Sequence, residues 1–195
     1  SKLAIDGGKP LHTKPWRTGA FHVREELRVL SDVLSGPALP MARGPRVMRL
    51  REDLQACYGM RYAVPVSSGS AAIHVALFAA GVGAGDEVIV SPLTDYGSII
   101  GIFQLNAIPV FADVLPDSIL MDVADVKKKI TRRTKAIMPV HNGGYAVDMR
   151  ALNRLAKAHD IKVVEDCAQA HLAALGKKHL GQYGDISAWS FNESK

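Results

Sequence analysis

The sequence predicts an α/β fold, a three-layer sandwich in which helices cover both faces of a mostly parallel sheet. Short, almost continuously apolar segments recur along the 195 residues, and segments with helical patterns separate them. Strands buried on both faces are apolar throughout because neither face meets water. Each apolar segment also ends in polar or glycine-rich residues. Since ligands of such sheets bind at the carboxyl ends of the strands, these polar ends are expected to form the site.

Composition and charge fit a globular protein and exclude several classes. Hydrophobic residues make up 48% of the chain and charged residues 22%, as is usual for soluble folds. The net charge of +5 is modest, and the basic residues form no continuous stripe with aromatic residues, so we expect no nucleic-acid partner. Two cysteines exclude a disulfide scaffold and favour the cytoplasm. We expect no signal peptide and no membrane association.

Three regions are expected along the chain, beginning at the N-terminus. Residues 1–22 predict an extended arm, because Gly7, Gly8 and Pro10 disfavour a long helix. Residues 23–60 predict two helices, over 23–34 and 46–58, from apolar residues at helical spacing. Glycine follows the end of each helix, as is typical of helix termini. Residues 61–195 are then expected to form the large domain.

Strands and helices alternate in that domain. Apolar runs predict strands at 61–66, 86–92, 107–113, 135–141 and 161–166, with a further apolar segment in 184–195. Helical patterns lie between them at 71–80, 99–105, 122–130 and 148–159. The strand ends carry hydroxyls, an aromatic side chain, a carboxylate, an amide and an amine, within residues 67–70, 94–96, 141–143, 166–169 and 190–195.

The segment Ser67-Ser-Gly-Ser70 predicts an anion site between a strand and a helix. Unpaired N–H groups and the positive end of the helix dipole point to one spot there, and the hydroxyls of Ser68 and Ser70 add donors. The lysine of a P-loop and the Gly-x-Gly-x-x-Gly pattern of dinucleotide sites are both absent. A serine N-cap beside a glycine turn is the structural alternative.

Asp166 and Lys195 suit a pyridoxal phosphate (PLP) cofactor, whose ring nitrogen must stay protonated and whose aldehyde must be held by an amine. Asp166 follows a buried apolar run, and its alternative is a structural acid that caps a helix. An amine beside a cationic ring has a lowered pKa and becomes a nucleophile and proton carrier, although most lysines are solvated. Gln169 could donate to the phenolate oxygen of the ring, and Ser190 could reach a phosphate or bond backbone.

The remaining residues are candidates for a substrate contact, a nucleophile or a metal site. His141 ends a strand beside Asn142-Gly-Gly144 and is a candidate substrate contact together with Asn192. Cys167 is interpreted as packing rather than as a nucleophile, because no histidine is in register with it. The spacing of histidine and cysteine matches no metal site, so no metal is expected.

Four motifs carry a resemblance to a known family: residues 67–72, 85–90, 164–170 and 184–195. In this order they resemble the DegT/DnrJ/EryC1/StrS sugar aminotransferases, which belong to the aspartate aminotransferase superfamily of fold type I. The resemblance covers essentially the whole chain, including Gly7-Gly-Lys-Pro10. It implies the PLP-binding large domain of such an enzyme without its small C-terminal domain.

The resemblance also implies roles for individual residues. Lys195 would hold the aldehyde of PLP, Asp166 the pyridine nitrogen and Gln169 the O3′ oxygen. The phosphate would be held by Ser68, Gly69, Ser70 and Ser190. The family places an aromatic side chain over the ring where this sequence has Asp95, so either Tyr96 stacks on the ring through a shifted turn or a different contact replaces the stacking.

The implied reaction is transfer of an amino group from glutamate or glutamine to a keto-sugar, often nucleotide-linked, or to a cyclitol ketone. Family members are homodimers with the active site at the interface, so a homodimer is expected. Three alternatives remain: a dehydratase of the family, a non-catalytic PLP-binding regulator and a nucleotide-binding α/β domain. Lys195 disfavours the first, because that branch has histidine there, and the missing glycine fingerprint disfavours the last.

Overall fold

The computed structural model describes residues 2–14, 22–36 and 43–192. The chain divides into two units, residues 1–39 and 40–195. The first unit contains a short 3₁₀ helix, η1 (Ala4–Asp6), and α1 (Val23–Leu34), which confirms the predicted helix over 23–34. Four of the apolar residues of α1 are each more than half exposed within the structure: Val23, Leu27, Leu30 and Leu34.

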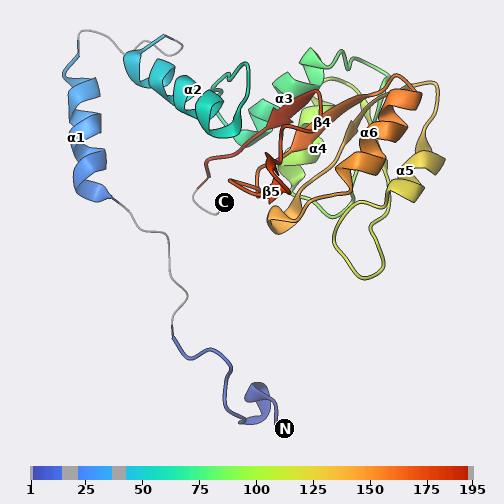
Figure 1. The fold of residues 1–195 in the computed structure, drawn as a ribbon, viewed down its shortest axis with the longest axis horizontal. Coiled ribbons are helices and arrows are strands. Elements are labelled where there is room, and N and C mark those ends of the chain that lie inside the picture. The colour runs from blue at the N-terminus through green and yellow to red at the C-terminus, as the bar shows by residue number, and fades with distance from the viewer. Residues whose placement is uncertain (1, 15–21, 37–42, 193–195) are drawn as a thin grey trace. The chain divides into compact units, whose positions relative to one another are not determined.

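The second unit is built around a parallel sheet, which confirms the predicted fold class (Figure 1). In the described residues its order is β2–β1–β3–β4–β7, and every pair of neighbours is parallel. The strands are β1 (Glu87–Val90), β2 (Ile108–Phe111), β3 (Thr134–Met138), β4 (Lys162–Asp166) and β7 (Ile186–Ala188). The predicted strands over 86–92, 107–113, 135–141 and 161–166 are therefore present but shorter.

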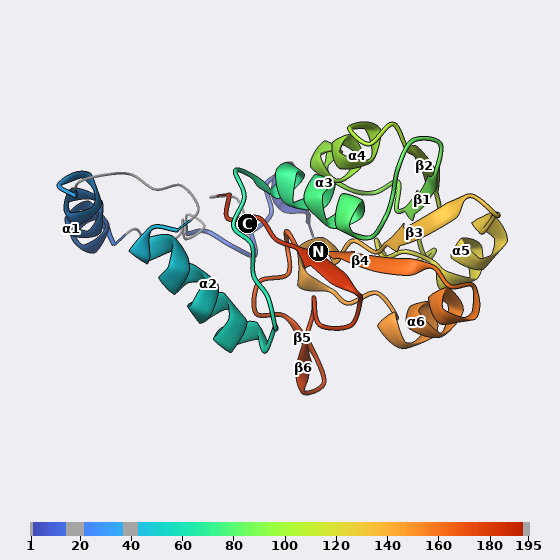
Figure 2. The same cartoon turned by 90° about the horizontal axis from the view of Figure 1, so that it is seen from above.

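Two helical layers cover the sheet, as Figure 2 shows. On one face α3 (Gly69–Ala79) and α4 (Tyr96–Phe103) form a core with Val88, Met138 and Val164. On the other face α5 (Val123–Lys129) and α6 (Met149–Ala158) pack on Ile89, Ile137 and Val163. Successive residues of the central strands β1, β3 and β4 thus enter opposite cores, which explains why these strands carry apolar residues on both faces.

Capping side chains, a proline and a glycine mark the points at which the helices begin and end. Ser68, Asp95, Asp122 and Asp148 each accept a hydrogen bond from a backbone N–H of the helix that follows. The helix α2 (Pro45–Tyr58) begins with proline at its first position and ends at Gly59, whose φ of 61° is left-handed. The predicted helix over 46–58 is confirmed within one residue. No helix among the described residues is long and apolar enough to cross a membrane.

The predicted strand over 61–66 is wrong. This segment is extended but pairs with no strand among the described residues, and Tyr62 and Val64 are 71% and 72% exposed. Side chains of α2 bond its carbonyls instead: Arg51 Nε donates to Ala63 at 2.9 Å, and Gln55 Nε2 donates to Arg61 at 2.6 Å. A short antiparallel hairpin, β5 (Ala174–Leu175) and β6 (Lys178–His179), was not predicted.

Candidate active site

A pocket of about 480 Å³ lies at the carboxyl ends of the central strands. The N-termini of α3 and α4 form one side, and the residues that follow β4 and β7 form the other. Its lining is Val66, Ser67, Ser68, Gly69, Ser70, Ile73, Thr94, Asp95, Gly97, Ser98, Val140, Asp166, Ala168, Gln169, Trp189, Ser190, Phe191 and Asn192. Seven of the predicted site residues are therefore brought together: Ser68, Gly69, Ser70, Asp166, Gln169, Ser190 and Asn192.

The N-terminus of α3 provides a place for a small anion. The Ser68 side chain caps the helix by accepting from the Ala71 N–H at 3.1 Å, and Gly69 approaches Ser190 closely. A Cβ added at Gly69 would lie 2.8 Å from the Cβ of Ser190, so only glycine fits without displacement. First-turn N–H groups and serine hydroxyls on both sides suit phosphate.

Asp166 lies at the end of β4 on the sheet side of the pocket. The residue is only 3% exposed, and both carboxylate oxygens accept hydrogen bonds. The Ala168 N–H donates to Oδ1 at 3.0 Å, and the Ser98 hydroxyl donates to Oδ2 at 2.6 Å. Its backbone N–H donates to the Pro139 carbonyl, and its carbonyl accepts from the His141 N–H. The carboxylate is therefore held by α4 and by the turn after β4, while the segment that follows β3 holds its backbone.

Gln169 lines the pocket beside Asp166, with its orientation set by one hydrogen bond. Its Oε1 accepts from the Gly143 N–H at 2.9 Å. Because the oxygen is engaged by the protein, the amide NH₂ is the group that can donate to a ligand.

One predicted residue, Tyr96, lies outside the lining of the pocket. Tyr96, the first residue of α4, is 67% exposed and is not among the described residues that line the pocket; Asp95 is, and it accepts from the Gly97 N–H at 2.7 Å. The turn thus directs residue 95, not 96, to the pocket. Lys195 lies outside the described residues.

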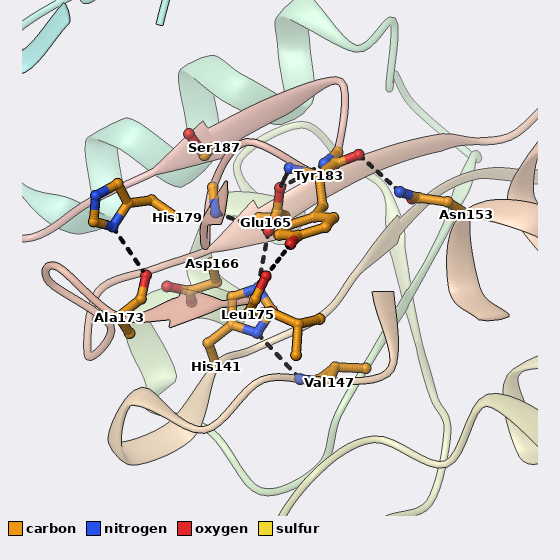
Figure 3. A network of polar contacts seen from close by, with 12 residues as sticks. His141, Val147, Asn153, Glu165, Asp166, Ala173, Leu175, His179, Tyr183 and Ser187 are labelled. Atoms are coloured by element: carbon orange, nitrogen blue, oxygen red, sulfur yellow. Dashed lines mark hydrogen bonds and ion pairs between the residues drawn. The ribbon is translucent and has the colours of Figure 1, made fainter. Parts of the chain in front are cut away.

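His141 is fully buried beneath the pocket rather than in it, contrary to its predicted role as a substrate contact. Its Nε2 lies 3.0 Å from Glu165 Oε2, and its Nδ1 accepts from the Val147 N–H at 3.4 Å, as Figure 3 shows. Since Nδ1 is an acceptor, the ring proton is on Nε2, and His141 donates to Glu165. The histidine therefore orients a buried carboxylate.

The described residues include one cluster that resembles a metal site. Ligand atoms of His141, Glu165 and Cys167 lie within 4.8 Å of one another, all buried. Both Glu165 oxygens already accept N–H donors, which leaves them poorly placed for a cation. Burial first, and then the charges of Glu165 and Asp166, raise the pKa of the Cys167 thiol well above its usual value. The thiol is therefore a poor nucleophile and packs as predicted.

Ser98, a pocket residue that is 3% exposed and bonds Asp166, is not among the site residues predicted from the sequence. Little in the sequence indicates this residue, because the predicted helix over 99–105 begins after Ser98, whereas α4 begins at Tyr96 and places Ser98 in its first turn, four residues after Thr94. The two hydroxyl oxygens are 2.7 Å apart.

A parallel α/β sheet whose strand ends combine a helix N-terminus, serine hydroxyls and a buried carboxylate defines a site for a small phosphorylated molecule. The model of the DegT/DnrJ/EryC1/StrS aminotransferase family matches residues 22–195, and the chain belongs to this family.

Named relatives are about a third or more identical to this chain over the aligned residues. The L-glutamine:2-deoxy-scyllo-inosose aminotransferase of Streptomyces kanamyceticus is 38% identical over 202 residues, covering 100% of this chain and 47% of that protein. The GDP-perosamine synthase of Vibrio cholerae is 39% identical over 154 residues, covering 79% and 42%. The structure of ntda from Bacillus subtilis with bound cofactor PMP has a TM-score of 0.81 at 31% identity, covering 89% and 38%. The chain thus spans about half the length of the curated relatives it matches.

Proposed function

We propose that the protein is a PLP-dependent aminotransferase that moves an amino group from glutamine or glutamate to a keto-cyclitol or keto-sugar. The observation that carries the proposal is the pocket of this family member, which joins a phosphate-binding helix N-terminus to a buried carboxylate. A related structure contains PMP, the aminated form of the same cofactor.

The residues present fit PLP. The N-terminus of α3 with Ser70 and Ser190 suits its phosphate, the Asp166 carboxylate suits a ring N–H, and the Gln169 amide suits the ring oxygen. When bound, the cofactor supplies an electron sink that makes a neighbouring C–H acidic. Asp166 keeps the ring nitrogen protonated, and the Lys195 amine binds the aldehyde and carries the proton.

The names of relatives support the substrate class. One relative is named for L-glutamine as donor and a deoxy-inosose as acceptor, and another for a GDP-linked amino sugar. We extend the proposal to a homodimer with the active site between subunits, as the family resemblance implies. We also propose a cytoplasmic location, with which the two free cysteines agree.

The half-reaction tests this function. Purified protein loaded with PLP is mixed with glutamine or glutamate without an acceptor, and absorbance spectra and mass spectrometry follow the cofactor. We expect stoichiometric conversion of PLP to pyridoxamine phosphate, with the matching keto acid released. Bound PLP that stays unchanged with every amino donor would instead favour the non-catalytic regulator.

The phosphate end of the pocket is tested by Gly69→Ala. The new Cβ would clash with Ser190, and such overpacking costs about 1–3 kcal/mol, so PLP affinity is expected to fall roughly tenfold. Gly83→Ala is the matched control, because a Cβ there lies 3.9 Å from its nearest neighbour. Fluorescence titration of the apo-protein with PLP measures both variants. Equal affinities in Gly69→Ala and Gly83→Ala would place the phosphate elsewhere.

A further inference from the structure

Three side chains form a chain of hydroxyl and carboxylate groups at the pocket. Ser98 Oγ donates to Asp166 Oδ2 at 2.6 Å, and Thr94 Oγ1 lies 2.7 Å from Ser98 Oγ. Ser98 has a single hydroxyl proton, which goes to the carboxylate, so Thr94 must be the donor to Ser98. The direction of donation is thereby fixed from Thr94 through Ser98 to Asp166.

These hydrogen bonds matter because the groups that they join are buried. Ser98 and Asp166 are each only 3% exposed, and a buried carboxylate needs hydrogen-bond donors to remain ionised. The distance of 2.6 Å is that of an O–H···O⁻ bond, which is stronger than a neutral one. Donation by Thr94 polarises the Ser98 hydroxyl and strengthens it further.

The backbone fixes the geometry of the three groups. Thr94 lies just before the N-cap of α4, and Ser98 lies in the first turn, where its N–H donates to the Asp95 carbonyl at 3.0 Å. Asp166 is held at the end of β4, 68 residues away in the sequence from Ser98. The hydrogen bond from Ser98 to Asp166 thus joins the first turn of α4 to the end of β4.

We propose that Ser98 is a positioning residue, whose hydroxyl, supported by Thr94, holds the Asp166 carboxylate ionised and oriented to accept the ring N–H of the cofactor. The inference rests on the proposed function, since it requires a pyridine ring over Asp166. It assigns to α4 a part in controlling the protonation of the cofactor.

Two ligands separate this role from simple packing. The apo-protein and its Ser98→Ala variant are titrated with PLP and with 1-deazapyridoxal phosphate, in which C–H replaces the ring nitrogen. We expect Ser98→Ala to weaken PLP binding about tenfold, the effect of losing one charge-assisted hydrogen bond. Binding of the deaza analogue should stay within about twofold, because this ligand offers Asp166 no N–H.

Ser91→Ala is the matched control, since Ser91 is a buried serine at the same sheet edge whose hydroxyl hydrogen-bonds the backbone of Leu93. It should leave the ratio of the two affinities unchanged, whereas Ser98→Thr, which keeps a hydroxyl, should restore most of the PLP affinity. If Ser98→Ala does not fold, Thr94→Val takes its place, with an expected selective loss of roughly threefold.

The outcomes distinguish the two proposals. Equal losses for both ligands, or none, overturn the positioning role while leaving PLP as the cofactor. Failure of the wild-type protein to bind PLP at all overturns the proposed function and this inference with it. A selective loss for PLP supports both.

Discussion

Replacing Lys195 by alanine is expected to abolish amino-group transfer. The amine has two duties in the proposed reaction, holding the aldehyde of the cofactor and carrying the proton, and no other residue of the predicted site is a primary amine. Loss of the proton carrier alone lowers turnover by roughly 10²–10⁴-fold. Turnover with glutamine and a keto-cyclitol measures the effect, and the absorbance band of covalently held PLP should vanish with it.

Lys157→Ala is the control for this experiment, because Lys157 is exposed on α6, away from the pocket. It should keep both turnover and the absorbance band. Partial recovery of Lys195→Ala by an added small amine would show that the variant is folded and lacks only its amine. Unaltered turnover in Lys195→Ala would remove the basis for assigning this residue.

The fold was predictable because its signals are local or periodic. Strands buried between two helical layers must be apolar, and the cap Asp148 marks the start of the helix predicted over 148–159 by its residue type alone. The segment 61–66 was wrongly predicted to be a strand because a short, mostly apolar segment has the same sequence pattern whether or not a strand lies beside it. Whether a segment pairs as a strand depends on which other segments lie beside it in the fold, and a local sequence pattern does not contain this information.

The site was predictable where residues follow directly from strand ends, as Asp166 and Gln169 do. The site was less predictable where the direction of a side chain decides whether the residue reaches the pocket. His141 ends a predicted strand as Asp166 does, yet its ring turns inward to Glu165, while Asp95 rather than Tyr96 reaches the pocket. Hydrogen-bond partners distant in sequence decide these directions.

Glu165 shows what such a distant network does. The fully buried carboxylate accepts at Oε1 from the N–H groups of Tyr183 and Gly184, at 2.7 and 2.5 Å, and at Oε2 from Gly181 and His141, at 2.8 and 3.0 Å. Three of the four donors belong to the loop that leads into β7, the strand before Ser190. Figure 3 shows the carboxylate in the middle of this network. One side chain thus anchors the segment that carries the predicted phosphate contact.

We therefore expect Glu165→Gln to destabilise the protein by about 3–5 kcal/mol, although the two side chains have nearly the same shape. The amide has one oxygen, so its NH₂ group must face two of the four N–H donors, which are then buried without an acceptor. Urea unfolding of the apo-protein at neutral pH measures the change as a lower midpoint at an unchanged slope.

Glu52→Gln provides the matched control, since Glu52 is exposed on α2, and its change should stay within about 0.5 kcal/mol. A loss of less than about 1 kcal/mol in Glu165→Gln would mean that the loop before β7 does not depend on the carboxylate. The cofactor adds a second readout, because a loosened loop displaces Ser190 from the N-terminus of α3. PLP affinity should then fall in Glu165→Gln even at temperatures where the variant is fully folded.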